Sequence, residues 1–201
     1  MKLRHSPASP YVRKVMIVAI ESGLAGRIET VPTTVLPVKP NDSLKPENPL
    51  VKIPALTTDD GETLYDSPVI CEYLDSLHGG TKFFPPAGAA RWTALRRQAL
   101  GDGVLDAAIL CRYETAARPK ALQWADWIEG QMRKVRGALD AIEGERLDGV
   151  FDIGTITIAC ALGYLDFRFP DENWRKTHPR LAAWFAEVSK RPSMKETVPQ
   201  G

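Results

Sequence analysis

The pattern of apolar and polar positions changes character once along the chain. In residues 1–77, short segments that alternate like strands are interleaved with stretches whose apolar residues recur at helical spacing. Beyond Gly88 the strand-like segments nearly vanish and helical spacing dominates. The pattern predicts an α/β module in residues 1–77, a Gly- and Pro-rich linker over 78–88, and an all-helical module in residues 89–201.

The first module is expected to contain two helices, and both begin with a Ser-Pro pair. Ser9 is a good N-cap and Pro10 suits the first helical position, and Ser67-Pro68 repeats the pair. The remaining segments either alternate like strands or are rich in Pro, Asn, Asp and Ser, which predicts irregular structure. The expected elements are a strand at 2–4, a helix at 10–20, a strand at 27–31, a long connection at 32–49, strands at 55–58 and 62–65, and a helix from 67.

The second module is expected to be a bundle of helices. Asp152–Asp166 is apolar on nearly every side, which predicts a helix buried at the centre of the bundle. Gly101 and Gly103 are expected to weaken the middle of the helix before it. The other expected helices are one at 91–117, one that begins at Pro119, and one that begins at Pro179 and ends at Arg191-Pro192.

Composition and charge exclude several classes of protein. Hydrophobic residues make up 44% and charged residues 25% of the chain, as in ordinary soluble proteins. The net charge of +1 provides no basic surface for nucleic acid. The N-terminal residues lack the apolar core of a signal peptide, and no apolar run could span a bilayer, so we expect a cytoplasmic location. Three scattered cysteines and three scattered histidines indicate neither a disulfide framework nor a metal site.

The two helix starts are candidate anion-binding sites. A helix N-terminus presents unpaired N–H groups and a partial positive charge, so Ser9 and Ser67 could each help to hold an anion. The alternative is that both serines only cap their helices, which by itself contributes about 1 kcal/mol. Ile53 is a third candidate, because a cis bond to Pro54 would leave its N–H and C=O free for an extended ligand. A trans bond is the common alternative.

Four stretches of the chain carry recognisable motifs. They are Ser9–Arg13, the segment N-P-x-x-x-I-P-x-L at 48–56, the segment acid-Ser-x-x-I-x-x-Y-L at 66–74, and Phe151-Asp152-Ile153 with Gly163-Tyr164-Leu165. Together these motifs resemble the bacterial cytosolic glutathione transferases that use a catalytic serine, and the resemblance covers essentially the whole chain. It implies a thioredoxin-like domain at 1–77 and a helical-bundle domain at 89–201.

The resemblance implies that the first domain binds glutathione, an extended tripeptide with one thiol and two carboxylates, as a co-substrate. The N–H and C=O of Ile53, before Pro54, would pair with its cysteinyl residue. Asp66 would meet the ammonium of the γ-glutamyl end, and Ser67 would meet its carboxylate at the helix N-terminus. The candidates for the glycyl carboxylate are Lys52 and Lys39, each of which could instead be a solvated surface lysine.

Ser9 is the implied catalytic residue, and Ser6 in the same turn is the alternative. A free thiol titrates at about 8.5, and a hydroxyl donor with the first N–H groups of the helix would lower that pKa. A serine cannot form a mixed disulfide with glutathione, so conjugation, peroxide reduction or isomerisation is favoured over disulfide reduction. Tyr11 falls inside the helix and is not expected to replace Ser9.

The resemblance gives smaller roles to residues outside the glutathione site. Asp102 could reach glutathione bound to the partner subunit of a homodimer, or it could be an exposed acid in a helix bend. Asp152 is expected to be structural, and Gly149 replaces the family's capping Ser or Thr, so that half of a reciprocal cap is lost. A small hydrophobic electrophile would lie against Ser9 between the modules. Candidate lining residues, each of which could also be plain packing, are Pro7, Tyr11, Tyr113 and Tyr164.

The resemblance therefore implies a homodimeric glutathione transferase that conjugates hydrophobic electrophiles in detoxification, and we expect no metal and no nucleic-acid or membrane partner. A glutathione-dependent isomerase or peroxidase on the same fold is one alternative. A transferase-like module that binds protein partners without catalysis is another. The combination of Ser9, Ile53-Pro54 and Asp66-Ser67 argues against this last alternative, because a docking module would not require all three.

Overall fold

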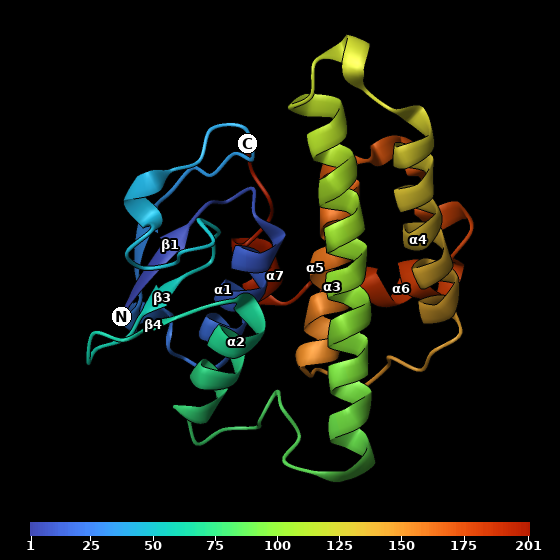
Figure 1. Ribbon diagram of the computed structural model, residues 1–201. Helices are drawn as coiled ribbons and strands as arrows, with labels where there is room; N and C mark the ends of the chain where they lie inside the picture. The colour runs from blue at the N-terminus through green and yellow to red at the C-terminus, as the bar shows by residue number, and fades with distance from the viewer. The chain divides into compact units, whose positions relative to one another are not determined.

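The computed structural model describes residues 1–201 and divides the chain into two compact units (Figure 1). Unit 1 comprises Met1–Pro86 together with Pro192–Gly201, and unit 2 comprises Ala87–Arg191. Unit 1 contains a sheet and the two Ser-Pro helices, whereas unit 2 contains only helices and turns. The predicted order, an α/β module followed by a helical module, is therefore confirmed.

Unit 1 is built on a four-stranded sheet that is covered by helices. Its elements are β1 (Lys2–His5), α1 (Pro10–Glu21), β2 (Glu29–Pro32), β3 (Leu56–Thr57), β4 (Thr63–Leu64), α2 (Ser67–Ser76) and α7 (Pro192–Glu196), with 3-10 turns at Ala25–Arg27 and Asp42–Leu44. The strand order is β2-β1-β3-β4. β1 runs parallel to β2 and antiparallel to β3, and β3 is antiparallel to β4. Leu3 and Leu56, on neighbouring strands, are fully buried in the core.

α1 is buried on more than one face. A single apolar stripe would predict one buried face, but two other helices also pack on α1. Val15, Ile17 and Val18 point in different directions around the helix, and all are fully buried. α2 and α7 both contact α1. α7 belongs to residues 192–201, which the predicted boundaries placed with the helical module. The prediction differs from the structure here because a proline can both end one helix and begin the next, and no local pattern shows which unit a short helix packs against.

Unit 2 is a bundle of four helices, one of which is buried at its centre. Its elements are α3 (Gly88–Ala116), α4 (Ala125–Glu143), α5 (Ile153–Arg168) and α6 (Pro179–Val188), with 3-10 turns at Lys120–Leu122, Pro170–Glu172 and Trp174–Lys176. α5 is the predicted central helix, and it packs along α3 and against α6. A Cβ at Gly101 would lie 2.9 Å from a side-chain atom of Thr157 and 3.0 Å from its backbone. Gly101 thus allows close packing of α3 on α5. The predicted weakening at Gly101 and Gly103 does not interrupt α3, which is continuous through both residues. No helix in the molecule combines the length and apolar character needed to cross a membrane.

The helix after α3 begins later than predicted. Pro119 precedes a 3-10 turn, and α4 begins only at Ala125. The N-cap of α4 is Trp124, whose N–H donates to the carboxylate of Glu114 at 2.9 Å. A side chain from α3 therefore satisfies the start of α4, which local sequence signals could not reveal.

The start of α5 is fully capped, contrary to the expectation from Gly149. The Asp152 carboxylate accepts from the Thr155 N–H at 2.9 Å, and the Thr155 hydroxyl accepts from the Asp152 N–H at 2.9 Å. These two bonds form a reciprocal capping box. The expected loss of half of the cap was wrong because the partner of Asp152 lies three residues after it. Gly149, with φ of 72°, instead forms the turn before the helix.

Candidate functional site

The turn from Ser6 to Ser9 joins β1 to α1 and places two hydroxyls at a helix N-terminus. The Ser9 N–H donates to the Ser6 carbonyl at 3.1 Å. Ser9 is the N-cap of α1, and its side-chain oxygen accepts from the Val12 N–H at 3.3 Å. Accepting a bond uses only a lone pair, so the hydroxyl hydrogen of Ser9 can still be donated to a ligand.

Strand register brings three segments together at the edge of the sheet where that turn lies. The register of β1 against β3, with Leu3 opposite Leu56, leads onward to Ser6 opposite Ile53. β3 is antiparallel to β4, so Ile53, before β3, lies toward the same edge as Ser67, after β4. Ser6 and Ser67 therefore follow the ends of β1 and β4, and Ile53 precedes the start of β3, at one edge of unit 1.

Ile53 presents a backbone donor and acceptor that the chain does not use. The Ile53–Pro54 peptide bond is cis, and neither the N–H nor the C=O of Ile53 makes a hydrogen bond within the chain. The turn before it is held by Asn48, which accepts from the Leu50 N–H at 3.0 Å and donates to the Lys52 carbonyl at 2.9 Å. An extended ligand could therefore pair with Ile53 as an added strand would.

The start of α2 also keeps its polar groups unused. Asp66 is the N-cap of α2, but its carboxylate makes no capping bond. Ser67 is only 1% exposed, and its hydroxyl has no hydrogen-bond partner within the chain. The first N–H groups of a helix have no intrahelical acceptors. A ligand carboxylate could accept from Ser67, and a ligand ammonium could pair with Asp66.

The positions of the remaining predicted residues of unit 1 do not by themselves assign them a role. Lys39 and Lys52 are exposed and form no ion pair within the chain, which is compatible with both roles considered for them. Pro7 lines the pocket beside Ser9. Tyr11 lies inside α1, as predicted, and does not line that pocket.

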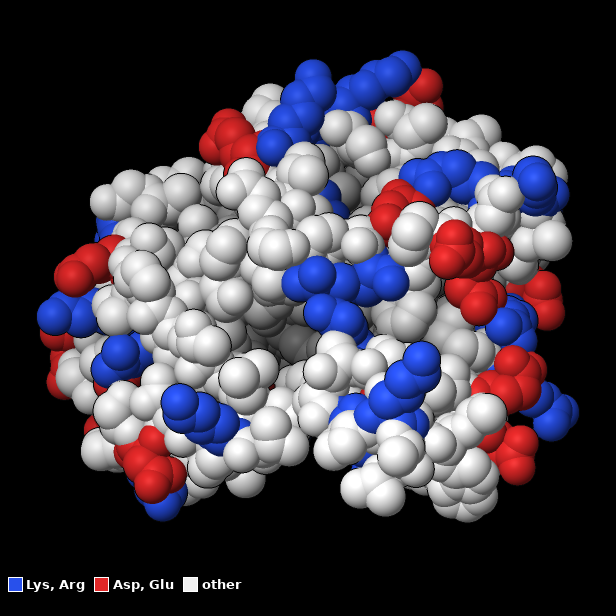
Figure 2. Space-filling view, turned by 90° about the horizontal axis from the view of Figure 1, so that it is seen from above, with Lys and Arg blue, Asp and Glu red and all other residues white.

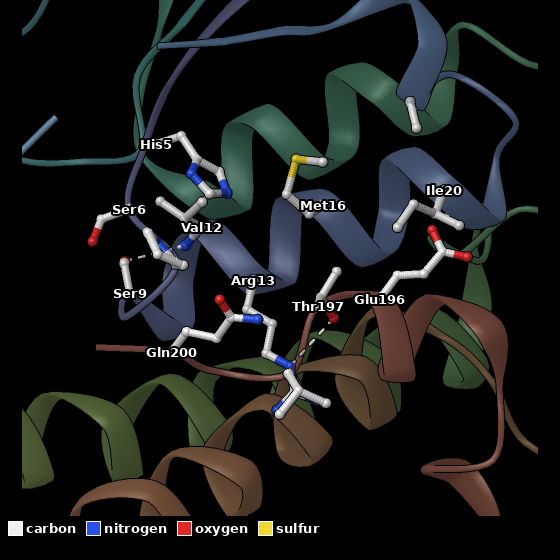
Figure 3. A pocket seen from close by; sticks show the side chains of 13 residues that line it. His5, Ser6, Ser9, Val12, Arg13, Met16, Ile20, Glu196, Thr197 and Gln200 are labelled. Atoms are coloured by element: carbon white, nitrogen blue, oxygen red, sulfur yellow. Dashed lines mark hydrogen bonds between the residues drawn. The ribbon is translucent and has the colours of Figure 1, made fainter. Parts of the chain in front are cut away.

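A pocket of about 320 Å³ adjoins the Ser6–Ser9 turn (Figure 3). α1 forms one side of the pocket, and the C-terminal residues 196–200 form another. The end near the turn includes Ser6, Ser9 and Gln200, and the part farther along α1 includes Met16, Ile20 and Glu196.

The C-terminal residues that line the pocket are held in place by hydrogen bonds. Arg13 of α1 is buried, and it donates to the Met194 carbonyl at 3.2 Å and to the Thr197 hydroxyl at 3.4 Å. The Gln200 N–H donates to the Pro7 carbonyl at 3.3 Å. No role was predicted for these residues from the sequence. Arg13 sits between apolar positions of a helix, and nothing in the C-terminal residues signals that they return to unit 1.

His5 is a further pocket residue that the sequence analysis left without a role. It ends β1, and its carbonyl accepts from the Thr33 N–H at 2.8 Å. Burial lowers the pKa of His5, so the imidazole is neutral at neutral pH. His5 therefore adds a neutral hydrogen-bonding group, not a positive charge, to the pocket.

The predicted residues of unit 2 have different environments. Tyr164 is 4% exposed, and burial raises its pKa to about 12. Tyr113 is partly exposed, and burial raises its pKa as well. Both phenols are therefore protonated at neutral pH and can act as hydrogen-bonding groups but not as bases. Asp102 is half-buried in the continuous α3, which differs from the exposed acid in a helix bend that we considered for it.

Charged side chains of both signs are interspersed over the face shown in Figure 2. This distribution agrees with the near balance of 26 basic and 25 acidic residues. No group of three or more His, Cys, Asp or Glu side chains is arranged to hold a metal ion. The distinctive chemical feature of the chain is therefore the set of unused polar groups at the sheet edge of unit 1.

Each of two segments of the chain, one in unit 1 and one in unit 2, matches a known protein family. Residues 8–77 match the family described as "Glutathione S-transferase, N-terminal domain". Residues 125–187 match the family described as "Glutathione S-transferase, C-terminal domain". These matches agree with the predicted architecture, in which a thioredoxin-like sheet domain precedes a helical domain.

Individual relatives match along almost their whole length. The chain is 34% identical to the uncharacterized GST-like protein YibF of Escherichia coli K12, over 99% of this chain and 98% of that protein. A glutathione transferase family member from Pseudomonas fluorescens Pf-5, crystallised with bound glutathione, is 50% identical with a TM-score of 0.97, over 100% and 99% of the chains. A second crystal structure of a family member from that organism, with bound S-(propanoic acid)-glutathione, is 48% identical with a TM-score of 0.93, over 100% of both chains. The chain therefore belongs to the glutathione S-transferase family.

Proposed function

We propose that this protein is a glutathione transferase that holds glutathione on unit 1 and joins its sulfur to a small hydrophobic electrophile. The observation that carries the proposal is the set of polar groups that the chain leaves unused at one sheet edge. The N–H and C=O of Ile53, the carboxylate of Asp66 and the hydroxyl of Ser67 have no partners within the chain. A relative that is 50% identical was crystallised with bound glutathione.

Each unused group corresponds to one part of the tripeptide. The N–H and C=O of Ile53 pair with the cysteinyl residue in the manner of an added strand. Asp66 meets the ammonium of the γ-glutamyl end, and the hydroxyl and N–H of Ser67 meet its carboxylate. Lys52 and Lys39 are the candidates for the glycyl carboxylate, because both are exposed and form no internal ion pair.

Ser9 acts on the sulfur. Its hydroxyl hydrogen is donated to the thiolate at the N-terminus of α1, where the unpaired N–H groups and the helix dipole add to the stabilisation. The thiol proton passes to water. With an isothiocyanate, the thiolate attacks the central carbon, a C–S bond forms, and an electron pair moves to nitrogen, which takes up a proton. With an aryl halide, the C–S bond replaces the carbon–halogen bond and halide leaves.

Several finer assignments are proposals that rest on the family resemblance. Ser6, in the same turn, is the alternative to Ser9. The protein acts as a cytoplasmic homodimer, and Asp102 contributes to glutathione bound to the partner subunit. Because Ser9 cannot form a disulfide, detoxifying conjugation is favoured over thiol exchange. Isomerase or peroxidase chemistry on the same site would use the same glutathione contacts.

Calorimetric titration with glutathione tests the proposal, together with the ultraviolet absorbance of the bound thiolate followed against pH. We expect binding at millimolar glutathione or below, and a thiolate band that appears below the ordinary thiol pKa of about 8.5. Ser9→Ala should remove the band and retain binding, whereas Ser6→Ala and the exposed control Ser76→Ala should leave it. Absence of binding would contradict the transferase proposal and favour a protein-interaction module. Loss of the band in Ser6→Ala alone would transfer the role to Ser6.

A further inference from the structure

We infer that Asn48 is a positioning residue for glutathione, although it makes none of the contacts proposed for the tripeptide. It holds Val51 in a left-handed backbone conformation and thereby directs the N–H of Ile53 toward the ligand. This inference rests on the proposed function, in which that N–H pairs with the cysteinyl residue. It assigns a role in binding to a buried amide that does not itself touch glutathione.

The first step is the peptide plane between Lys52 and Ile53. The carbonyl of Lys52 and the N–H of Ile53 belong to one planar peptide unit. The bond between them is trans, so the C=O and the N–H point in opposite directions. The Asn48 side chain donates to the Lys52 carbonyl at 2.9 Å. That hydrogen bond therefore fixes the direction of the Ile53 N–H, which makes no bond within the chain.

The second step is the conformation of Val51, two residues before Ile53. Its φ of 54° lies in the left-handed region, where a β-branched residue is a genuine outlier. Such conformations persist only where the surrounding structure holds them, and they cluster at sites that bind ligands. The carbonyl of Asn48 accepts from the Val51 N–H at 2.9 Å, and its side-chain oxygen accepts from the Leu50 N–H at 3.0 Å. Together with the bond to Lys52, these bonds connect Asn48 to Val51 and to both of its neighbours.

The third step is that Asn48 is itself fixed in place and in orientation. It is 2% exposed, and its N–H donates to the carbonyl of the buried Leu44 at 2.8 Å. Exchanging its side-chain oxygen and nitrogen would set an oxygen against the Lys52 carbonyl and an NH2 group against the Leu50 N–H. Only one orientation of the amide satisfies both partners, so Asn48 can act as a rigid template for residues 50–52.

Calorimetric titration of glutathione into the full chain tests the inference with two substitutions. Asn48→Asp keeps the size and the acceptor but, when ionised, loses the donor to Lys52, and Asn48→Ala removes both side-chain bonds. We expect each variant, shown by circular dichroism to be folded, to bind glutathione about five- to tenfold more weakly. The matched control is Asn41→Asp, because Asn41 in the same connection also donates to a carbonyl, that of Thr34 at 3.3 Å. It should bind as the unmodified protein does.

Two further readouts separate positioning from a general loss of structure. At saturating glutathione, the thiolate band should appear at the same pH in the folded Asn48 variants as in the unmodified protein, because Ser9 and not Ile53 acts on the sulfur. Adding Val51→Gly to Asn48→Ala should tighten binding by at least about threefold, because glycine adopts positive φ without the steric cost that valine has. A purely structural role of Asn48 predicts no such recovery in a protein that is already folded.

Amide hydrogen exchange in the unmodified protein gives a test that does not depend on the folding of any variant. Without ligand, the N–H groups of Leu50 and Val51 should exchange slowly because both are bonded to Asn48, and the N–H of Ile53 should exchange fast. Glutathione should slow the exchange of Ile53. An Ile53 amide that bound glutathione leaves unprotected would contradict the strand-like pairing on which the inference rests.

The outcomes separate the two proposals. Failure of glutathione to bind the unmodified protein would contradict the proposed function. Normal binding with an unchanged Kd in both Asn48 variants would overturn the inference alone, as would a weakened Asn48→Ala variant that Val51→Gly does not improve. Fast exchange of Leu50 and Val51 in the unmodified protein would also overturn it, because Asn48 would then not hold the turn.

Discussion

The two Ser-Pro helix starts of unit 1 have the same dipeptide and opposite local chemistry. At α1 the serine is the N-cap, and its oxygen accepts a bond from the Val12 N–H. At α2 the serine is already inside the helix, Asp66 is the N-cap, and neither side chain makes a capping bond. A shift of one residue in the position of the helix start therefore separates a self-capped helix from one whose polar groups remain unused.

This difference shows why a capping motif alone does not identify a binding site. A capped start contributes to stability with or without a ligand. The Ser67 hydroxyl makes no bond within the chain and is not among the buried unpartnered atoms, so it remains open to a ligand or to water. The α2 start therefore points to a ligand more strongly than the α1 start, although Ser9 is the residue proposed to act on sulfur.

The largest expected effect is on glutathione binding at α2. Ser67→Ala removes a donor to a ligand carboxylate, and hydrogen bonds to charged groups contribute about 1.5–3 kcal/mol. We expect the Kd for glutathione, measured by calorimetry, to rise by roughly 10- to 100-fold. Ser76→Ala, at the other end of α2, is the control. An unchanged Kd in Ser67→Ala would show that the open helix start is not the γ-glutamyl site.

A smaller effect is expected on stability, and it should follow the capping bonds. Asp152→Ala removes the capping box of α5 and should lower the free energy of unfolding by about 1–2 kcal/mol. Ser9→Ala removes a single bond of 3.3 Å and should cost about 0.5–1 kcal/mol. Ser67→Ala removes no internal bond and should cost almost nothing. Urea unfolding of the three variants without ligand measures this order, and a Ser67→Ala cost equal to that of Asp152→Ala would contradict it.

The smallest effect concerns the ion pair that links β1, which leads to Ser9, to the connection that leads to Ile53. Arg4 donates to Glu47 at 2.8 Å from Nε and again from Nη2, and these bonds lower the pKa of Glu47. A lowered carboxyl pKa gives stability that is present above the unfolded value of about 4.5 and is lost as the pH falls through the folded value. Glu47→Gln should therefore cost below about 1 kcal/mol at pH 7, and the cost should be smaller at pH 3, below the unfolded value.

Urea unfolding at both pH values measures this effect, with the exposed Glu62→Gln as the matched control. A cost of Glu47→Gln that is as large at pH 3 as at pH 7 would show that the pair does not act through its charge.

The order of elements could be predicted because it depends on local patterns. The helix start at Pro10 and the buried helix after Asp152 follow from N-capping signals and apolar spacing, and both are present. The Ser67-Pro68 start was also found in the sequence, but the pattern could not show that Asp66 takes the N-cap position. That choice depends on how β4 delivers the chain to α2, which is tertiary information.

The pocket residues that were not predicted from the sequence are positioned by contacts between residues far apart in the chain. Arg13 bonds to residues more than 180 positions away, and the half-buried His5 lines the same pocket as residues 196–198. A basic residue within a helix is usually solvated, so its burial cannot be inferred from spacing alone. The predicted site residues were therefore those with local motifs, whereas the missed residues are those positioned by the return of the C-terminal segment.

That return has a consequence for how the protein is made and handled. The first 86 residues are synthesised before the whole of unit 2, and residues 192–201 are synthesised after it. One side of α1 therefore lacks its cover, and the pocket lacks a wall, until residues 192–201 have left the ribosome. An affinity tag fused directly after Gly201 would begin two residues from the pocket-lining Gln200, and one fused before Met1 would replace the N-terminal ammonium that pairs with Asp59 at 2.6 Å.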